Sequence, residues 1–286
     1  DPDGDALNIQ VDASSLPQGV TYNHSDSATV QVTTTSYYGF NQTVTIPAVD
    51  TLTLDTSKSD FSALAQGEVA DVTVNYEVTD GTLSTAAQAI FHVTGVNDAP
   101  VVAAPVAATA TEDGAAVTVS GLANATDVDH GAVLSVVNVP AVLPPGITYD
   151  AATHSFSINP ADPAFQSLAQ DQVQTYSVSY GVSDGMATTM TTVNFTVIGV
   201  NDAPVVTGPV TASPNEDGQI ATINALANAT DVDDPQYQGH GIVVTGVPDT
   251  LPAGVTYDAA NHRFSLDPSN ATYQSLSQGE TRDVVV

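Results

Sequence analysis

The feature that most constrains this chain is a segment that occurs twice without change. Gly95-Val-Asn-Asp-Ala-Pro-Val-Val102 returns as Gly199-Val-Asn-Asp-Ala-Pro-Val-Val206, so the two copies begin 104 residues apart (199 − 95). A period of this length is too long for one turn of a solenoid and suits one small domain. The sequence therefore predicts tandem domains joined by Val-Asn-Asp-Ala-Pro, a connector that its proline holds extended.

Shorter motifs recur around this joint and indicate three repeats, of which only the middle one is complete. The recurring motifs are Asp127-Val-Asp129 with Asp231-Val-Asp233 and Asp1-Pro-Asp3, Glu112-Asp-Gly114 with Glu216-Asp-Gly218, and Asp80-Gly81 with Asp184-Gly185. We expect repeats over residues 1–99, 100–203 and 204–286, the first and last of them incomplete. The first repeat carries an insertion at about 24–52, which we interpret as an added hairpin with Tyr37, Tyr38 and Phe40 near its tip.

Each repeat has the pattern of short strands. Val72–Val78, Tyr176–Val182 and Val193–Val197 alternate apolar and polar residues, and β-branched residues dominate them. Gly, Pro, Asn and Asp separate such runs every eight to twelve residues or so, which is typical of sandwiches. The predicted fold is all-β, a linear array of tandem Ig-like antiparallel β-sandwiches.

Composition narrows the possible partners. Three basic residues stand against 32 acidic ones, a formal net charge of −29. Such a chain repels nucleic acid and anionic membrane surfaces, and it attracts cations. The absence of cysteine excludes disulfides and thiolate metal sites. The sequence has no signal peptide and no apolar run long enough to span a membrane, so we expect no membrane insertion. Both ends of the chain fall within the repeat pattern, as in a segment of a longer protein.

The order of strands and turns brings acidic residues together at the joints. Following the chain from turn to turn places five carboxylates at the first joint: Glu68, Asp98, Asp127, Asp129 and Asp184. The second joint draws on Glu112, Asp202, Asp231 and Asp233. Carboxylates held so close repel one another, and calcium, which takes six to eight oxygen ligands, removes that repulsion. The sequence therefore predicts calcium at both joints.

Each acidic motif also has a structural interpretation. Asp80 and Asp184 sit in favoured hairpin turns, and Asp127 and Asp129 suit Asx turns. Asp98 and Asp202 could cap a proline turn, and Glu112 could be a solvated turn residue. The six histidines have no metal-ligand spacing and are interpreted as incidental. No catalytic or phosphate-binding motif occurs, and the acidic pairs recur with each repeat, so we expect no enzyme.

Together, Asn97-Asp-Ala-Pro100, Glu112, Asp127-Val-Asp129 and Asp184-Gly resemble the cadherin repeat. They resemble even more the bacterial cadherin-like (VCBS-type) tandem repeats of large RTX-type, type I-secreted adhesins. The resemblance implies calcium ligands at Glu68, Asn97, Asp98, Asp127, Asp129 and Asp184 in the first joint, and at Glu112, Asn201, Asp202, Asp231 and Asp233 in the second.

The chain departs from the cadherin pattern in three ways. Gly95 and Gly199 stand where cadherins carry Asp, a second Asn after the joint Asp is missing, and Gln172 replaces the Glu found at position 68. We therefore expect fewer ions per joint than is usual in the family, with Asp171 as a weak substitute for the missing Glu.

These features lead to one main hypothesis and two alternatives. The main hypothesis is a calcium-stiffened extracellular stalk or extender segment of a bacterial adhesin, at the cell surface or secreted. The first alternative is an adhesion module that binds a glycan or a host or cell-surface protein through Tyr37, Tyr38 and Phe40. The second is a set of spacer repeats in a secreted hydrolase.

Overall fold

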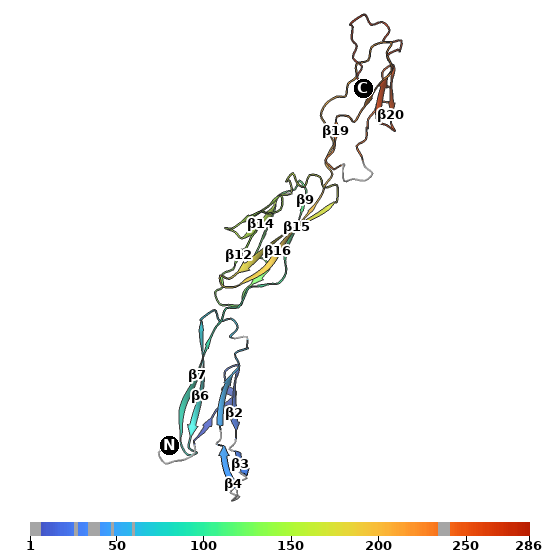
Figure 1. Ribbon diagram of the computed structural model, residues 1–286. Coiled ribbons are helices and arrows are strands. Elements are labelled where there is room, and N and C mark those ends of the chain that lie inside the picture. Colours follow the sequence, from blue (N-terminus) through green and yellow to red (C-terminus); the bar gives the residue numbers. More distant parts are fainter. Residues whose placement is uncertain (1–6, 26–27, 34–40, 47–48, 59–60, 234–240) are drawn as a thin grey trace. The chain divides into compact units, whose positions relative to one another are not determined.

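The structure is a computed structural model that describes residues 7–25, 28–33, 41–46, 49–58, 61–233 and 241–286. These residues form β-strands and one turn of 3-10 helix, η1 (Ala13–Ser15) (Figure 1). None of the described segments is a helix long and apolar enough to cross a bilayer. The predicted all-β class is therefore confirmed.

The strands have the following bounds. Those up to the first joint are β1 (Asn8–Gln10), β2 (Val20–Ser25), β3 (Ala28–Thr33), β4 (Asn41–Ile46), β5 (Val49–Leu54), β6 (Val69–Thr79) and β7 (Ser84–Thr94). Those up to the second joint are β8 (Val101–Val102), β9 (Val106–Thr111), β10 (Val117–Ser120), β11 (Ala125–Thr126), β12 (Ser135–Val137), β13 (Ile147–Asp150), β14 (Ser155–Ile158), β15 (Val173–Ser183) and β16 (Thr188–Ile198). Those that follow are β17 (Val205–Val206), β18 (Ala221–Asn224), β19 (Ala229–Thr230), β20 (Val255–Asp258) and β21 (Arg263–Leu266).

The chain groups into two compact units. The first consists of Asp1–Ala103, Asn124–Val137 and Gly181–Met190, and the second of Ala104–Ala123, Asn138–Tyr180 and Thr191–Val286. The first unit thus contains the first joint with parts of the segment that follows it, and the second unit contains the second joint with the rest of the chain. The division into three repeats at 99 and 203 stays a prediction.

In the first unit, β6 and β7 form a long antiparallel ladder from Val69↔Thr94 to Thr79↔Ser84, and β1 pairs with the other edge of β6. Exposed and less exposed residues alternate along β6, as the period-two sequence pattern predicts. The turn between β6 and β7 is held by Asp80, whose Oδ1 accepts from the N–H groups of Thr82 and Leu83. In the inserted segment β2 pairs with β5 and β3 with β4.

The middle segment forms a four-stranded sheet, β12-β15-β16-β9, and a three-stranded sheet, β10-β14-β13. One pairing differs from the predicted antiparallel arrangement, because β9 runs parallel to β16 from Val106↔Val193 to Thr111↔Ile198. Phe156, Tyr180 and Phe195 are completely buried. The rings of Phe156 and Tyr180 lie 4.9 Å apart, so aromatic packing builds much of this core.

The buried Tyr180 hydroxyl donates to the Gly121 carbonyl over 2.7 Å. Tyr180→Phe should lower the free energy of unfolding by about 1–3 kcal/mol, because it leaves the Gly121 oxygen without its buried donor. Tyr76→Phe is the matched control, since Tyr76 holds the same position in β6, is only half-buried and has no hydroxyl partner among the described residues. Equal effects of the two substitutions in thermal unfolding would contradict this assignment.

Candidate metal sites

At the first joint, backbone hydrogen bonds link three of the predicted acidic residues. The N–H of Asp98 donates to Asp129 Oδ2 over 2.9 Å, and the N–H of Asp129 donates to Asp127 Oδ1 over 3.0 Å. The second of these bonds is an Asx turn, so the structural interpretation of Asp127 holds. The same bonds bring Asp127 and Asp129 next to the joint residue Asp98, as the predicted site requires.

Asn97 and Asp184 also meet, although they are 87 positions apart in the sequence. Asn97 Nδ2 donates to Asp184 Oδ2 over 2.9 Å and to the Asp98 carbonyl over 2.7 Å. Asp184 Oδ1 accepts from the N–H groups of Met186 and Ala187, and these bonds lower the pKa of Asp184. Asp184 is therefore a turn residue that lies beside the joint.

Glu68 is held by a local turn and by a histidine. Glu68 Oε2 accepts from the Ala65 N–H over 2.9 Å, and His130 Nδ1 lies 3.0 Å from the same oxygen. The Ala65 bond is the main cause that lowers the pKa of Glu68. The same turn bond recurs at Gln172 and Glu280, which accept from the N–H three residues earlier. This position therefore has a structural role that glutamine also fills.

His130 makes two contacts near the first joint that the sequence did not predict. Its side chain pairs with Glu68, and its N–H donates to the Ala63 carbonyl over 2.8 Å. His130 thus ties the segment after the joint to the turn before it. Its place directly after Asp127-Val-Asp129 was the only sequence signal that could have revealed this.

Glu68→Gln should change the free energy of unfolding by less than about 0.5 kcal/mol, because glutamine keeps the oxygen that accepts from Ala65. Glu68→Ala should cost about 1 kcal/mol, because the Ala65 N–H then loses its partner. Melting in chelator measures both changes. If Glu68→Gln instead lowers calcium affinity tenfold or more, about 1.4 kcal/mol, Glu68 is a ligand, as the family resemblance implied.

The second joint repeats the geometry of the first. The N–H of Asp202 donates to Asp233 Oδ2 over 2.7 Å, and the N–H of Asp233 donates to Asp231 Oδ1 over 3.0 Å. Asn201 Nδ2 donates to the Asp202 carbonyl over 2.6 Å. In both joints a glutamine carboxamide, Gln66 or Gln170, accepts from the joint asparagine N–H. The recurrence shows that the sequence repeat encodes one local structure.

Glu112 enters the second joint as a buried carboxylate. Its side chain is 2% exposed, and its Oε2 accepts from the Val200 N–H over 3.0 Å. Burial raises the pKa of Glu112, and the charges of Asp202, Asp233 and Asp113 raise it further. Burial also raises the pKa of Asp202, with added repulsion from Asp233, Asp113 and Asp231. These carboxylates are close enough to repel one another.

Asp113, like His130, lies at a joint but was not among the predicted site residues. Its charge acts on both Glu112 and Asp202. Its backbone is left-handed, with φ of 57°, and Gln166 Nε2 donates to its carboxylate over 2.9 Å. The motif Glu112-Asp-Gly114 contained the signal, because aspartate tolerates left-handed geometry better than most residues do.

Five buried side-chain oxygens have no hydrogen-bond partner within the described ranges. They are Asp127 Oδ2 and Asp129 Oδ1 at the first joint, and Glu112 Oε1, Asp202 Oδ2 and Asp233 Oδ1 at the second. All five belong to the predicted ligand set. A buried carboxylate oxygen without a donor is costly unless a cation balances it. A hard cation such as calcium, which prefers oxygen ligands, suits this donor set.

Hydrogen bonds connect neighbouring members of the predicted set, but the predicted residues do not form a complete coordination sphere for an ion. In the part of the chain that it describes, no three acidic or histidine side chains converge closely enough to hold a metal ion. Asp171 has left-handed geometry and hydrogen bonds to the neighbouring Gln170 side chain. Tyr37, Tyr38, Phe40 and Asp1-Pro-Asp3 lie outside the described residues.

The glycines that replace the cadherin aspartate have a structural cause. A Cβ at Gly95 would lie 2.4 Å from the carbonyl oxygens of Leu64 and Ala65, and a Cβ at Gly199 would lie equally close to those of Leu168 and Ala169. No side chain fits at either position. The ligand that cadherins place there is therefore excluded by packing.

Comparison with known proteins matches part of this chain to a family. The family model described as Cadherin-like domain matches residues 96–198. No curated protein matches the sequence.

Several solved structures are similar. PcdhgB3 EC1-4 is 14% identical over 87% of this chain and 57% of its own, with a TM-score of 0.44. Mouse cadherin-23 EC22-24 is 15% identical over 87% and 75%, with a TM-score of 0.42. The endo-fucoidan hydrolase MfFcnA4 from glycoside hydrolase family 107 is 16% identical over 92% and 34%, with a TM-score of 0.30. This chain thus spans less than two thirds of the first and third of these structures.

Proposed function

We propose, because residues 96–198 form a cadherin-like domain, that this chain is a calcium-stiffened extracellular stalk or extender segment of a bacterial surface adhesin. The observation that carries the proposal is the set of five buried, unpartnered carboxylate oxygens at the two joints. Acidic residues in the same arrangement recur at each joint, as a structural role requires, whereas a catalytic site needs to occur only once. The chain therefore acts as a structural binding protein and not as an enzyme.

In the first joint, Asp127 and Asp129 would offer their free oxygens to the ion, beside Asn97, Asp98 and Asp184. In the second, Glu112, Asp202 and Asp233 would offer theirs, with Asn201 and Asp231 next to them. Bound calcium supplies positive charge that cancels the repulsion between these carboxylates. The residues before and after each joint would then be fixed to each other, which stiffens the connector.

Calorimetric titration of calcium into the chelator-treated full chain tests this proposal. We expect binding with dissociation constants of roughly 10⁻⁴ to 10⁻³ M, the range of extracellular modules. Calcium at one hundred times the constant should stabilise the protein by about 2.7 kcal/mol per site. Asp129→Asn should remove one binding event, whereas Asp267→Asn, in an exposed turn away from both joints, should remove none.

Small-angle scattering of the same samples tests the stiffening itself. The spread of particle dimensions should narrow when calcium is added and widen again in chelator. The proposal is refuted if calcium at saturating concentration produces no heat of binding and no shift in melting temperature. Calcium binding without any change in scattering would retain the metal sites but remove the role in stiffening.

A further inference from the structure

His130 makes a direct connection across the first joint. Its side-chain Nδ1 lies 3.0 Å from Glu68 Oε2 and 3.1 Å from Glu68 Oε1, and its N–H donates to the Ala63 carbonyl over 2.8 Å. Ala63 and Glu68 precede the joint, whereas His130 follows it, 62 positions after Glu68. One residue thus bonds to the preceding segment through both its backbone and its side chain.

The turn that receives His130 is itself firmly held. Its Leu64 side chain is only 5% exposed. The Gly95 N–H donates to the Glu68 carbonyl over 2.7 Å, and the Gly95 carbonyl accepts from the Gly67 N–H over 3.0 Å. The turn is therefore fixed to the chain directly before the connector Val96–Pro100 begins.

On the other side of the joint, His130 directly follows Asp129, which is bonded to the connector. The Asp98 N–H donates to Asp129 Oδ2 over 2.9 Å. The hydrogen bonds form a closed ring, because Glu68 is bonded both to Gly95 before the connector and to His130 after it. A connector enclosed in such a ring cannot bend far unless at least one of these bonds breaks.

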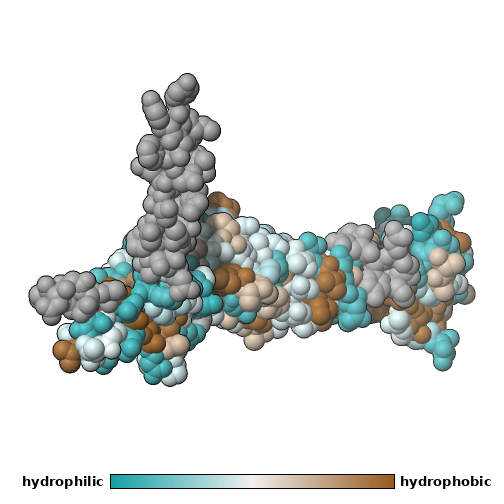
Figure 2. All heavy atoms as spheres, turned by 90° about the horizontal axis from the view of Figure 1, so that it is seen from below, coloured by the Kyte–Doolittle hydropathy of each residue, from teal (hydrophilic) through white to brown (hydrophobic). Residues whose placement is uncertain are grey.

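Apolar packing adds little at the connector. Val96, its first residue, is 68% exposed, and Val101, directly after it, is 62% exposed. On the face drawn in Figure 2, brown apolar patches are separated by teal and white surface. Hydrogen bonds, more than apolar burial, therefore restrain the connector.

We infer that His130 is a latch that keeps the first joint ordered when no calcium is bound. The carboxylates of the joint repel one another in that state, and the latch opposes the separation that this repulsion favours. The bond from Nδ1 to Glu68 needs only one proton on that nitrogen, which a neutral imidazole tautomer supplies as well as the imidazolium does. The latch thus adds a calcium-independent restraint to the proposed stalk, and only the comparison with calcium rests on that proposed function.

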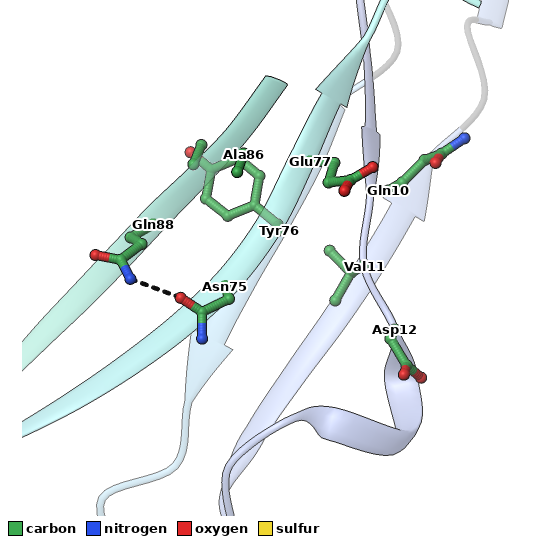
Figure 3. A pocket seen from close by; sticks show the side chains of 9 residues that line it. Gln10, Val11, Asp12, Asn75, Tyr76, Glu77, Ala86 and Gln88 are labelled. Carbon is green, nitrogen blue, oxygen red and sulfur yellow. Dashed lines mark hydrogen bonds between the residues drawn. The ribbon is translucent and has the colours of Figure 1, made fainter. Parts of the chain in front are cut away.

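The first unit offers a matched histidine pair that does not cross the joint. His92 Nδ1 pairs with Asp71 Oδ1, and these two residues lie opposite each other on β7 and β6. Gln88 Nε2 and Asn75 Oδ1, 2.7 Å apart, form another polar pair between the same two strands (Figure 3). Removal of the His92 side chain should therefore disturb a pair of the same chemistry within one sheet and leave the joint unchanged.

Distances between two spin labels in the full chain test the latch. The chain has no cysteine, so Thr73→Cys in β6 and Thr188→Cys in β16 give two unique labelling sites at exposed positions of the first unit. In chelator, His130→Ala should broaden the distance distribution about twofold or more, because loss of the latch adds bent conformers to the ensemble. His92→Ala should leave the width unchanged. An unchanged width in His130→Ala, or equal broadening by His92→Ala, would overturn the inference.

Hydrogen exchange at the backbone amide of residue 130 gives a second measurement. In chelator, the protection factor of this amide should fall about tenfold or more in His130→Ala, because its bond to the Ala63 carbonyl opens more often. Amides in the ladder of β6 and β7 should keep their protection, which shows that the variant is folded. Equal protection of amide 130 in both proteins would count against the latch.

Calcium distinguishes this inference from the proposed function. We expect calcium to narrow the broad distribution of the His130→Ala chain, because the ion and the latch restrain the same joint. If calcium does not narrow it while the results in chelator hold, the latch stands and calcium stiffening of this joint fails. If the chain that retains His130 is already as broad in chelator as the variant and calcium narrows both, calcium stiffening stands and the latch fails.

Discussion

Glu112→Gln is expected to leave the thermal stability of the protein equal or higher without calcium and to lower it with calcium. Without calcium, Glu112 is a buried carboxylate whose pKa is raised by burial and by neighbouring acidic residues. Glutamine removes that charge but keeps the oxygen that accepts from the Val200 N–H. The melting temperature in chelator should therefore stay equal or rise. The charge that destabilises the calcium-free protein is the one that would attract the ion.

With calcium in excess the variant should be less stable than the wild type, because the second joint would lose a charged ligand oxygen. If calcium at one hundred times the dissociation constant stabilises the wild-type site by about 2.7 kcal/mol, the variant should lose most of that amount. The measurement is differential scanning calorimetry of both proteins in chelator and in calcium.

Glu216→Gln is the matched control, because Glu216 occupies the same place in the repeat but is exposed. It should behave like the wild type in both solutions. A Glu112→Gln protein that is destabilised equally in chelator and in calcium would show that Glu112 acts only through its bond to Val200.

Local sequence patterns predicted the strands well. The alternation in Val72–Val78 and Tyr176–Val182 lies inside β6 and β15, which extend further at both ends. Such alternation reports a sheet with one face toward a core, which is a local property. The parallel pairing of β9 with β16 was not predicted, because partner choice depends on segments far apart in the chain. The stretch from Val101 to Thr111 is divided into two strands, β8 and β9, which pair with different partners.

At the joints, too, local sequence motifs were predictive, whereas contacts between residues far apart in the sequence were not predicted. The repeated motifs led to the residues that hold the unpartnered oxygens, because gathering carboxylates at every repeat is costly unless a cation binds them. The pairing of His130 with Glu68 could not be predicted, since neither residue recurs in all repeats and they lie 62 positions apart. Sequence motifs indicated which residues gather, whereas backbone hydrogen bonds decide which of their oxygens stay free.

Gly199→Ala should be among the most destabilising single changes in this chain. Two backbone bonds hold Gly199 in place, because its N–H donates to the Gln172 carbonyl over 2.8 Å and its carbonyl accepts from the Asp171 N–H over 3.0 Å. A Cβ would lie 2.4 Å from two backbone carbonyl oxygens, which cannot turn away as a side chain can. We expect a loss of about 3 kcal/mol, the upper part of the range for overpacking. This corresponds to a fall in melting temperature of about 10 °C or more.

The effect should reach the second metal site, because Gly199 is directly followed by Val200, whose N–H holds Glu112, and by Asn201 and Asp202. Calcium affinity at that joint should therefore fall together with stability. Gly95→Ala, with the same clash in the first unit, should cause a similar loss of stability but spare the second site. Val206→Ala, at a side chain that is 67% exposed, should change neither property. A Gly199→Ala protein that melts like the wild type would mean that the turn at Leu168 and Ala169 can move aside, so that packing does not explain why glycine replaces the cadherin aspartate.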